Sequence, residues 1–361
     1  MRILHFHPDP QMADRFISPL IDSERASGYF STLVSSIRRP GLNFYYLPFD
    51  LNFLNILFFP IAVLRVIFFL NKYRPDIVFC HNTKSSLIPL LSAYLSRVRV
   101  RVYFNHGVPY VGYRGFLRFL LLSLERLNCS LACHVVTVSR DMQDLLKNIS
   151  FKVDPIVIRH GSASGIDFDF FSNNLHGSIE WRKINGFDIR DLVVVFIGRP
   201  LRRKGFNFVL NLWARNFSES HFKLVLCGPT NGDVLKVLSS VPDNIISLGF
   251  VNNVNDVLAY SDLLILPSLH EGLSYACMEA QASGVVVVGN NVSGIRCLIE
   301  NGSTGFLVNN NTENVYVDII RYIDSNRSSL SPIIEQAKTS VFRYSRDLFI
   351  KDYLIFLDGI K

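Results

Sequence analysis

LHEGLSYACMEAQASG, residues 269–284, follows an apolar run at residues 263–266 that is typical of a buried strand. Two glutamates in it, Glu271 and Glu279, are separated by seven residues. On a helix that begins near Leu273, the second carboxylate would lie about two turns below the first, so each acid could reach a different part of one ligand. The backbone amides between the two acids would form an anion site at the positive end of that helix. The stretch therefore predicts a strand, a binding loop and a helix, which is the repeating unit of an α/β fold.

Short apolar or aromatic runs alternate with helical patterns along the whole chain. In the second half the runs are continuously apolar, which is typical of parallel strands covered by helices on both faces. We predict strands there at residues 192–197, 222–227, 245–248, 263–266 and 285–288, and helices at 206–216, 233–239, 255–260 and 273–282. In the first half we predict strands at 2–6, 29–34, 44–47, 76–80, 98–104, 134–138 and 156–159, and helices at 52–72, 85–96, 116–128 and 140–148.

A polar, turn-rich segment at residues 167–191 interrupts this pattern. With 361 residues, the chain is long enough for two domains that each bury their own core. We therefore predict an α/β protein with two Rossmann-like, doubly wound parallel-sheet domains that face a cleft. The expected bounds are 1–170 for the first domain, 171–191 for a linker, 192–332 for the second domain and 333–361 for a C-terminal helical segment that could pack back on the first domain.

The composition indicates a globular protein of a reducing compartment. Hydrophobic residues make up 49% of the chain and charged residues 19%. The six cysteines are scattered without the CxxC spacing of a metal or redox site, and the N-terminus lacks the pattern of a signal peptide. We therefore expect a cytoplasmic protein.

Positive charge is concentrated in the first domain. The net charge is +7, and residues 1–130 hold 15 Lys or Arg against 7 Asp or Glu. This excess could attract anionic lipid head groups or phosphorylated acceptors, or it could be a solvated surface.

An apolar segment of the same domain, LNFLNILFFPIAVLRVIFFL at residues 51–70, approaches the length of a membrane span but contains Pro60 and Arg65. A buried helix is the alternative to one that lies in the membrane interface. Together with the basic charge, the segment favours peripheral attachment to the anionic inner face of the membrane, with insertion by Phe58, Phe59, Phe68 and Phe69.

A second group of candidate residues follows the first strand of the second domain, in FIGRPLRRKGF at residues 196–206. Gly198 permits a tight exit from the strand, and Arg199 and Lys204 lie five positions apart on a loop that leads into a helix. Ligands of such sheets bind outside the carboxyl ends of the strands. Two cations here could hold both phosphates of a nucleotide sugar and stabilise the diphosphate as it leaves. The neighbouring arginines, Arg202 and Arg203, fit a solvated basic loop.

Together these motifs resemble the C-terminal nucleotide-sugar domain of retaining glycosyltransferases of family 4, which have the GT-B fold. The family's pattern is a Gly-Arg start, a downstream Lys-Gly, a Glu-Gly pair and a second Glu followed by Ala. These match residues 198–199, 204–205, 271–272 and 279–280. The likeness continues through LVLCGP (224–229), LGFV (248–251), AYSDLLILPS (259–268) and SGIRCLIENGSTGFLV (293–308), and so covers most of residues 192–310.

The resemblance implies a role for each matching residue. Arg199 and Lys204 would hold the diphosphate, and Glu279 would accept hydrogen bonds from the ribose hydroxyls. Glu271 would lie against hydroxyls of the transferred sugar. The remaining donor contacts would come from the amides of Gly272, Leu273 and Ser274, and from the backbone of Phe250 and Val251 beside the base.

The first domain resembles the family less closely. VYFNHGVPYVGYRG, residues 102–115, is similar to the strand-to-loop segment whose histidine faces the donor sugar, which makes His106 the candidate. A capped loop histidine is the alternative. VTVSRD (136–141) and IRHGSASGIDFDFF (158–171) are similar to segments that close this domain. The loop after the first strand departs from the family, because it reads HPDPQMADRFISPL (7–20) where many members have a glycine pair.

The resemblance implies a metal-independent, retaining transfer of a hexose or N-acetylhexosamine. The donor would be a UDP-sugar and the acceptor a membrane-associated, lipid-linked glycan of surface polysaccharide synthesis. No cofactor is expected, because Arg199, Lys204 and the helix amides would stabilise the leaving diphosphate. The leaving phosphate would take the acceptor's proton, so that His106 would orient and polarise rather than abstract.

Two alternatives stay open. A GT-B epimerase acting on a UDP-sugar would share the fold and nucleotide site but would need acid and base groups. A noncatalytic membrane-bound scaffold is disfavoured because the charged residues of the motifs are all present, namely Arg199, Lys204, Glu271 and Glu279. A nicotinamide enzyme is disfavoured because no GxGxxG follows the first strand. Nucleic-acid binding has only bulk charge in its favour, so no nucleic acid is expected as a partner.

Overall fold

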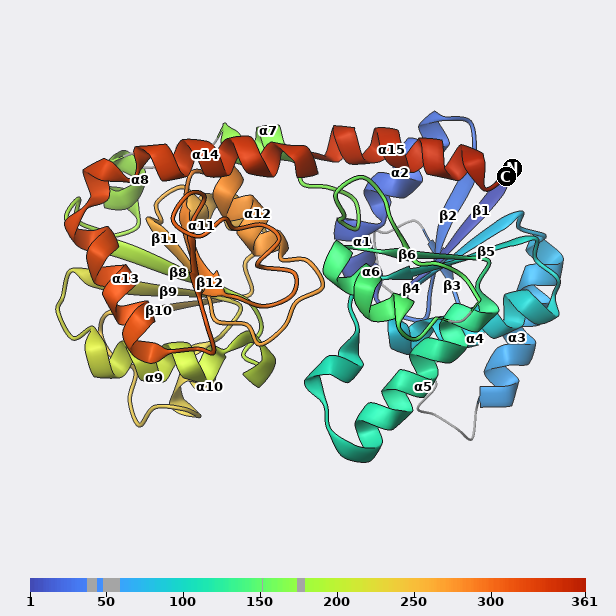
Figure 1. The fold of residues 1–361 in the computed structure, drawn as a ribbon, viewed down its shortest axis with the longest axis horizontal. Helices are drawn as coiled ribbons and strands as arrows, with labels where there is room; N and C mark the ends of the chain where they lie inside the picture. Colours follow the sequence, from blue (N-terminus) through green and yellow to red (C-terminus); the bar gives the residue numbers. More distant parts are fainter. Residues whose placement is uncertain (38–43, 48–58, 151, 174–178) are drawn as a thin grey trace. The chain divides into compact units, whose positions relative to one another are not determined.

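Two α/β units make up the chain, and each is built on one parallel sheet (Figure 1). The computed structural model describes residues 1–37, 44–47, 59–150, 152–173 and 179–361. The first unit comprises Met1–Gly165 with Arg346–Lys361, and the second comprises Ile166–Ser345. The predicted fold class, with two doubly wound parallel sheets, is confirmed.

The sheet of the first unit has the strand order β3-β2-β1-β4-β5-β6-β7. The chain begins in the middle at β1, moves outward to β3 and then returns to pair β4 with β1. Ligands of doubly wound sheets bind at the carboxyl ends of the strands where the order reverses in this way. The strands are β1 (Arg2–Phe6), β2 (Phe30–Ser35), β3 (Phe44–Tyr46), β4 (Ile77–His81), β5 (Val100–Asn105), β6 (His134–Thr137) and β7 (Ile156–Val157).

Helices cover both faces of this sheet (Figure 1). Helix α4 packs on β4 and β5 and contacts both α3 and α5, while α2 packs on β2 and contacts α15 from the far end of the chain. The helix α15 buries Phe349, Tyr353 and Leu357, which fixes the C-terminus to the first unit. The helices are α1 (Pro10–Phe16), α2 (Ser18–Ala26), α3 (Phe59–Tyr73), α4 (Thr83–Leu95), η2 (Pro109–Gly112), α5 (Gly115–Leu131), α6 (Arg140–Lys147) and α15 (Arg346–Gly359).

The sheet of the second unit has the order β10-β9-β8-β11-β12-β13, and its order reverses between β8 and β11. Its central strands are apolar on both faces, as their continuous hydrophobic runs predict. The strands are β8 (Leu192–Ile197), β9 (Phe222–Cys227), β10 (Ile245–Gly249), β11 (Leu263–Leu266), β12 (Val286–Asn290) and β13 (Phe306–Val308).

Large buried side chains join this sheet to its helices. Phe196 of β8 packs against Phe206 of α9, and Trp213 on the same helix packs against Phe217 and Phe222. The helices are α7 (Phe168–Ser172), α8 (Ile179–Ile184), η3 (Arg202–Lys204), α9 (Phe206–Asn216), α10 (Asn231–Leu235), α11 (Val254–Leu258), α12 (Tyr275–Ala282), α13 (Glu313–Ser325), η4 (Arg327–Ser329), α14 (Ser331–Val341) and η5 (Phe342–Tyr344).

The two units divide the chain at points that differ from the expected domain bounds. The first unit ends at Gly165, and α7 and α8 of the segment expected as a linker belong to the second unit. Residues 174–178 of that segment lie outside the described residues. The expected C-terminal segment is divided, because α14 belongs to the second unit and α15 to the first.

The apolar segment at residues 51–70 lies only partly within the described residues, which begin again at Phe59 with α3. Of the phenylalanines expected to insert into lipid, Phe58 is outside that part, Phe59 and Phe69 are half-buried, and Phe68 is 73% exposed. The buried face of α3 consists of Ala62, Val63, Val66 and Leu70. Among the described helices, none combines the length and the hydropathy that a membrane crossing requires.

Candidate active site

The loop between β8 and α9 carries the predicted cations of the second unit. Gly205 joins η3 to α9 with a φ of +74°, and a Cβ there would lie 2.4 Å from the carbonyl oxygen of Pro267. Only glycine fits this close approach. It brings Lys204 beside the segment that follows β11, where the first predicted glutamate lies.

A cation and an acid meet at this edge of the sheet. Lys204 Nζ donates to Glu271 Oε1 at 2.6 Å, and Ser268 Oγ donates to the same oxygen at 2.8 Å. Arg203 Nη1 lies 3.5 Å from Glu271 Oε2 and 3.4 Å from the carbonyl oxygen of His270. Burial alone would raise the pKa of Glu271, but the Lys204 ammonium and these hydrogen bonds outweigh it and hold the pKa below its ordinary value. Glu271 is therefore a buried carboxylate with its charge fixed in place.

Backbone contacts hold the loop around Glu271. Its N–H donates to the carbonyl oxygen of Ser293 at 3.1 Å, and the N–H of Ser274 donates to Gly294 O at 2.9 Å. Gly294 has a φ of +75°, and a Cβ on it would lie 2.7 Å from Glu271 O. The segment after β12 therefore sets the position of the acid.

The helix of this loop begins later than predicted. Helix α12 starts at Tyr275 rather than near Leu273, because the Ser274 side chain accepts from the N–H of Cys277 as an N-cap. The Ser274 amide already donates to Gly294 O, so it does not belong to the expected cradle of amides. Glu271 thus lies in the loop, while Glu279 is a buried residue of α12.

The remaining predicted donor residues lie on loops at the carboxyl ends of β8 and β10. Gly198 and Arg199 follow β8, and the Arg199 side chain is exposed with no ion pair among the described residues. Phe250 and Val251 follow β10, and the Phe250 ring is 73% exposed. The structure thus brings Lys204 into contact with Glu271 but shows no direct contact of Arg199, Phe250 or Val251 with that pair.

Sequence reasoning missed two partners of Glu271. Ser268 follows β11 directly after Pro267, and Arg203 is one of the arginines interpreted as a solvated loop. Their positions in the sequence could have indicated them, because Arg203 follows β8 and Ser268 follows β11, and these two strands are neighbours in the sheet.

His106 belongs to the first unit, where it follows β5. Burial lowers its pKa to about 3, so the imidazole is neutral near physiological pH. The preceding residue anchors the turn, because Asn105 Oδ1 accepts from the N–H of Gly107 at 2.8 Å and Asn105 Nδ2 donates to the buried Glu125. The histidine is thus held at the carboxyl edge of the first sheet.

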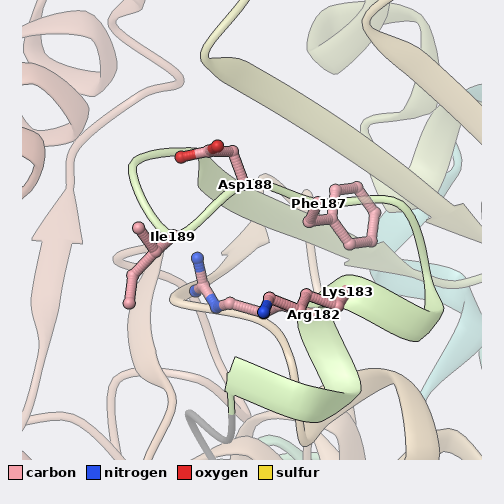
Figure 2. Close-up of a pocket in the computed structure, with 5 residues that line it drawn as sticks. All are labelled: Arg182, Lys183, Phe187, Asp188 and Ile189. Carbon is pink, nitrogen blue, oxygen red and sulfur yellow. The ribbon is translucent and has the colours of Figure 1, made fainter.

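A small pocket of the second unit lies elsewhere. Figure 2 shows it between α8 and the loop that follows, lined by Arg182, Lys183, Phe187, Asp188 and Ile189. Arg182 bonds to the Asp191 carbonyl oxygen at 3.0 Å and pairs with Asp262 at 2.5 Å, just before β8 and β11 begin. The pocket is therefore at the amino edge of the sheet, opposite the Lys204–Glu271 pair, and it holds none of the predicted site residues.

Two family models match the chain and together span most of it. The model described as Glycosyltransferase Family 4 matches residues 25–162, and the model described as Glycosyl transferases group 1 matches residues 178–340. The capsular polysaccharide biosynthesis glycosyltransferase CapM of Staphylococcus aureus is 24% identical over 68% of this chain and 67% of its own length. The UDP-Gal:alpha-D-GlcNAc-diphosphoundecaprenol alpha-1,3-galactosyltransferase of Escherichia coli is 25% identical over 71% of this chain and 68% of its own length.

Solved glycosyltransferases share the fold. Anabaena HepE, solved in complex with UDP and glucose, has a TM-score of 0.81 with 17% identity over 99% of both chains. WaaG, a glycosyltransferase involved in lipopolysaccharide biosynthesis, has a TM-score of 0.75 with 15% identity over 98% of both chains. The family models identify the chain, and these structures identify the fold: the chain belongs to glycosyltransferase family 4 and has the GT-B fold.

Proposed function

We propose that the protein transfers a hexose or an N-acetylhexosamine from a UDP-linked donor to a hydroxyl of a lipid-linked glycan, in the synthesis of a surface polysaccharide. The transfer retains the anomeric configuration and needs no metal. The observation that carries this proposal is the contact between Lys204 and the buried Glu271 at the carboxyl edge of the second sheet. A fixed cation beside a fixed acid suits a donor that has phosphate charge next to sugar hydroxyls.

The cations on this edge would bind the diphosphate of the donor, and the acids would bind its hydroxyls. An ammonium group has three N–H donors, and Glu271 accepts one from Lys204, so two are left for phosphate oxygens. The exposed guanidinium of Arg199 supplies a second, forked donor for the diphosphate. Glu271 would accept from sugar hydroxyls and Glu279 from the ribose. UDP is supported as the carrier by the name of the E. coli relative and by the HepE complexes with UDP and UDP-glucose.

In the proposed step, the bond between the anomeric carbon and the diphosphate oxygen breaks as the acceptor oxygen bonds to the same face of that carbon. The acceptor proton passes to the leaving phosphate oxygen, so no protein base is required. Negative charge grows on the diphosphate, and Arg199 and Lys204 stabilise it because they are already in position. His106 would orient and polarise a hydroxyl of the sugar.

A membrane-bound acceptor is supported by the surface of the first unit. Helix α5 exposes Phe116 at 79% and Phe119 at 62%, and it carries the exposed Arg118 between them. Aromatic rings that alternate with cations suit the interface of an anionic membrane. The E. coli relative acts, by its name, on a diphosphoundecaprenol-linked sugar. We therefore place the reaction at the inner face of the membrane.

The test is a donor and acceptor screen. The purified protein is incubated with UDP-hexoses or UDP-N-acetylhexosamines and with lipid-diphosphate sugars, with and without EDTA. We expect one donor to be consumed only when an acceptor is present, EDTA to leave the rate unchanged, and NMR to show the donor's anomeric configuration in the product. Isomerisation of free donor without acceptor would instead indicate an epimerase, and an inverted product would refute the retaining step.

A further inference from the structure

A buried row of side chains crosses the middle of the first unit and ends at His106. Glu24 of α2 lies 3.1 Å from His5 Nε2 through both of its carboxylate oxygens. His5 Nδ1 lies 3.1 Å from His81 Nε2, and His81 Nδ1 lies 2.9 Å from His106 Nε2. At the far end, the Tyr353 hydroxyl of α15 bonds to Glu24 Oε1. Three histidines of adjacent strands thus connect α2 and α15 to the carboxyl edge of the sheet.

Burial makes the direction of these hydrogen bonds important. The side chains of Glu24, His5, His81 and Tyr353 are completely buried. The His5 ring is also stacked on Phe79 at 4.7 Å between centroids, with an angle of only 2° between the planes. A buried polar atom without a partner is costly, so each ring must match its neighbour donor to acceptor.

The Glu24 carboxylate determines the donor-to-acceptor direction of the hydrogen bonds along this row. An ionised carboxylate only accepts, and both oxygens of Glu24 are equally close to His5 Nε2, which is the geometry of one N–H shared between two acceptors. A neutral His5 then has an unprotonated Nδ1, which must accept from His81 Nε2–H. His81 Nδ1 in turn accepts from His106 Nε2–H. The last member of the row is therefore left with a lone pair on Nδ1.

We propose that Glu24, His5 and His81 are positioning residues that hold His106 as its Nε2–H tautomer, so that Nδ1 accepts a hydrogen bond from a hydroxyl of the sugar substrate. This rests on the proposed function only for the identity of that hydroxyl. The direction of the row is a property of the first unit alone. We name it the histidine relay, with Glu24, His5, His81 and His106 as its members.

Burial and the neighbouring rings favour the neutral form of His81 and His106. Burial lowers the pKa of His81 well below its ordinary value, and the nearby rings of His106, His5 and His7 lower it further. Burial also lowers the pKa of His7, which faces the relay from the end of β1 and accepts from Asn82 Nδ2 at 2.7 Å. Glu24 is the carboxylate at one end of the relay, so the tautomers of the rings are ordered from that end.

Tyr353 makes the direction testable by one isosteric change. In Glu24→Gln, the Tyr353 hydroxyl would keep the side-chain oxygen, which leaves the amide NH₂ facing His5 Nε2. The amide N–H that replaces Oε2 needs an acceptor, so we expect His5 to accept at Nε2 and donate from Nδ1, and the reversal to pass through His81 to His106. The variant should present Nδ1–H, a donor, where the wild type presents an acceptor. Tyr353→Phe removes the hydroxyl but keeps the carboxylate, so it is the matched control and should not reverse the tautomer.

The experiment is ¹⁵N NMR of histidine-labelled full-length protein, which reports the protonated nitrogen of each neutral ring without substrate. We expect His106 to be protonated at Nε2 in the wild type and Tyr353→Phe, and at Nδ1 in Glu24→Gln. Protonation at Nδ1 in the wild type, or an equal mixture, would overturn the relay. The wild-type spectrum alone decides this if a variant does not fold.

Kinetics then connect the relay to the reaction. Glu24→Gln should lower kcat about tenfold, the effect of losing one hydrogen bond in the transition state, with little change in the KM of the donor. Tyr353→Phe should keep kcat. Unchanged kcat in Glu24→Gln despite the reversed tautomer would overturn the role of Nδ1 as an acceptor. Failure of every UDP-sugar in the wild type would refute the proposed donor while leaving the tautomer result intact.

Discussion

Lys204 Nζ lies 2.6 Å from Glu271 Oε1, and each residue follows a different strand of the second sheet. The pair holds the ammonium at the point where β8 and β11 are neighbours, which is where the strand order reverses. The acid is almost fully buried and the amine is partly exposed, so the acid orients the amine rather than the reverse. The position of the cation is therefore set by the protein before any phosphate binds.

Removing the Lys204 ammonium should lower the turnover rate more than it weakens binding of the donor. Lys204→Ala is expected to lower kcat on the order of a hundredfold or more, as for the loss of one preorganised charge stabiliser. Arg202→Ala is the matched control, because Arg202 lies on the same turn, is exposed and has no ion pair among the described residues. Initial rates with saturating donor measure both. Near-normal turnover of Lys204→Ala would refute its assignment.

A glycine substitution tests whether the loop after β12 positions Glu271. Gly294 and Gly302 have φ values of +75° and +79°, so alanine costs each about 1 kcal/mol of backbone strain. Only at Gly294 would the new Cβ also meet the Glu271 carbonyl oxygen, at 2.7 Å, whereas nothing lies within 4 Å of it at Gly302. We expect Gly294→Ala to lower kcat at least about tenfold by moving Glu271, and Gly302→Ala to keep it. Equal losses in both variants would show that strain alone is responsible.

Much of the second unit could be predicted from the sequence because its strands are continuously apolar. Strands β8, β9 and β11 and helix α9 have the bounds that the pattern predicts. The pattern gave no signal for β13, which is a three-residue strand at the edge of the sheet. In the first unit, α1 and α2 were missed, because prolines and polar residues in 7–20 are typical of a loop.

The candidate site was predictable as a set of residues but not as a geometry. Motif spacing placed Lys204 and Glu271 after strands, yet their contact depends on the turn at Gly205 and the close approach of Pro267. The histidine relay was beyond pattern reasoning for the same reason. His5 and His81 are far apart in the chain and are joined only by the pairing of β1 with β4.

The donor's ribose is expected at Glu279. Glu279→Ala should raise the KM of the UDP-sugar about tenfold or more, the cost of losing hydrogen bonds to a charged acceptor, with a smaller effect on kcat. Glu335→Ala, an exposed change on α14, is the control. Donor titrations at saturating acceptor measure the effect. An unchanged KM would place the ribose elsewhere.

Stability should depend on pH through Glu125, the buried acid behind the His106 turn. Burial raises its pKa to about 7, although hydrogen bonds from Thr83, Tyr103 and Asn105 oppose the shift. Between the ordinary value of 4.5 and about 7, the folded protein keeps a proton that the unfolded chain has lost. The free energy of unfolding therefore falls as pH rises through this window, by on the order of 3 kcal/mol.

Glu125→Gln should remove that dependence, because an amide does not titrate. Urea unfolding of the full-length protein is measured from about pH 4.5 to about pH 8. The free energy of unfolding should fall less over this range for Glu125→Gln than for the wild type. Glu335→Gln should keep the wild-type slope. A slope that is the same in all three proteins would mean that Glu125 is ionised throughout the window.

Attachment to lipid should require both the charge and the exposed rings of the first unit. Binding to vesicles with anionic lipid is expected to weaken as salt rises, because added ions screen charges beyond about 8 Å at physiological ionic strength. Phe116→Ser and Phe119→Ser should each weaken binding about tenfold or more, since burying one phenylalanine contributes about 1.5–3 kcal/mol. Ile355→Ser is the control, because Ile355 is an apolar residue of α15 in the same unit that is 63% exposed. Co-sedimentation measures each protein. Binding that does not depend on salt but is lost in Phe116→Ser and Phe119→Ser would indicate insertion without electrostatic attraction. An equal loss of binding in Ile355→Ser would show that α5 has no special role.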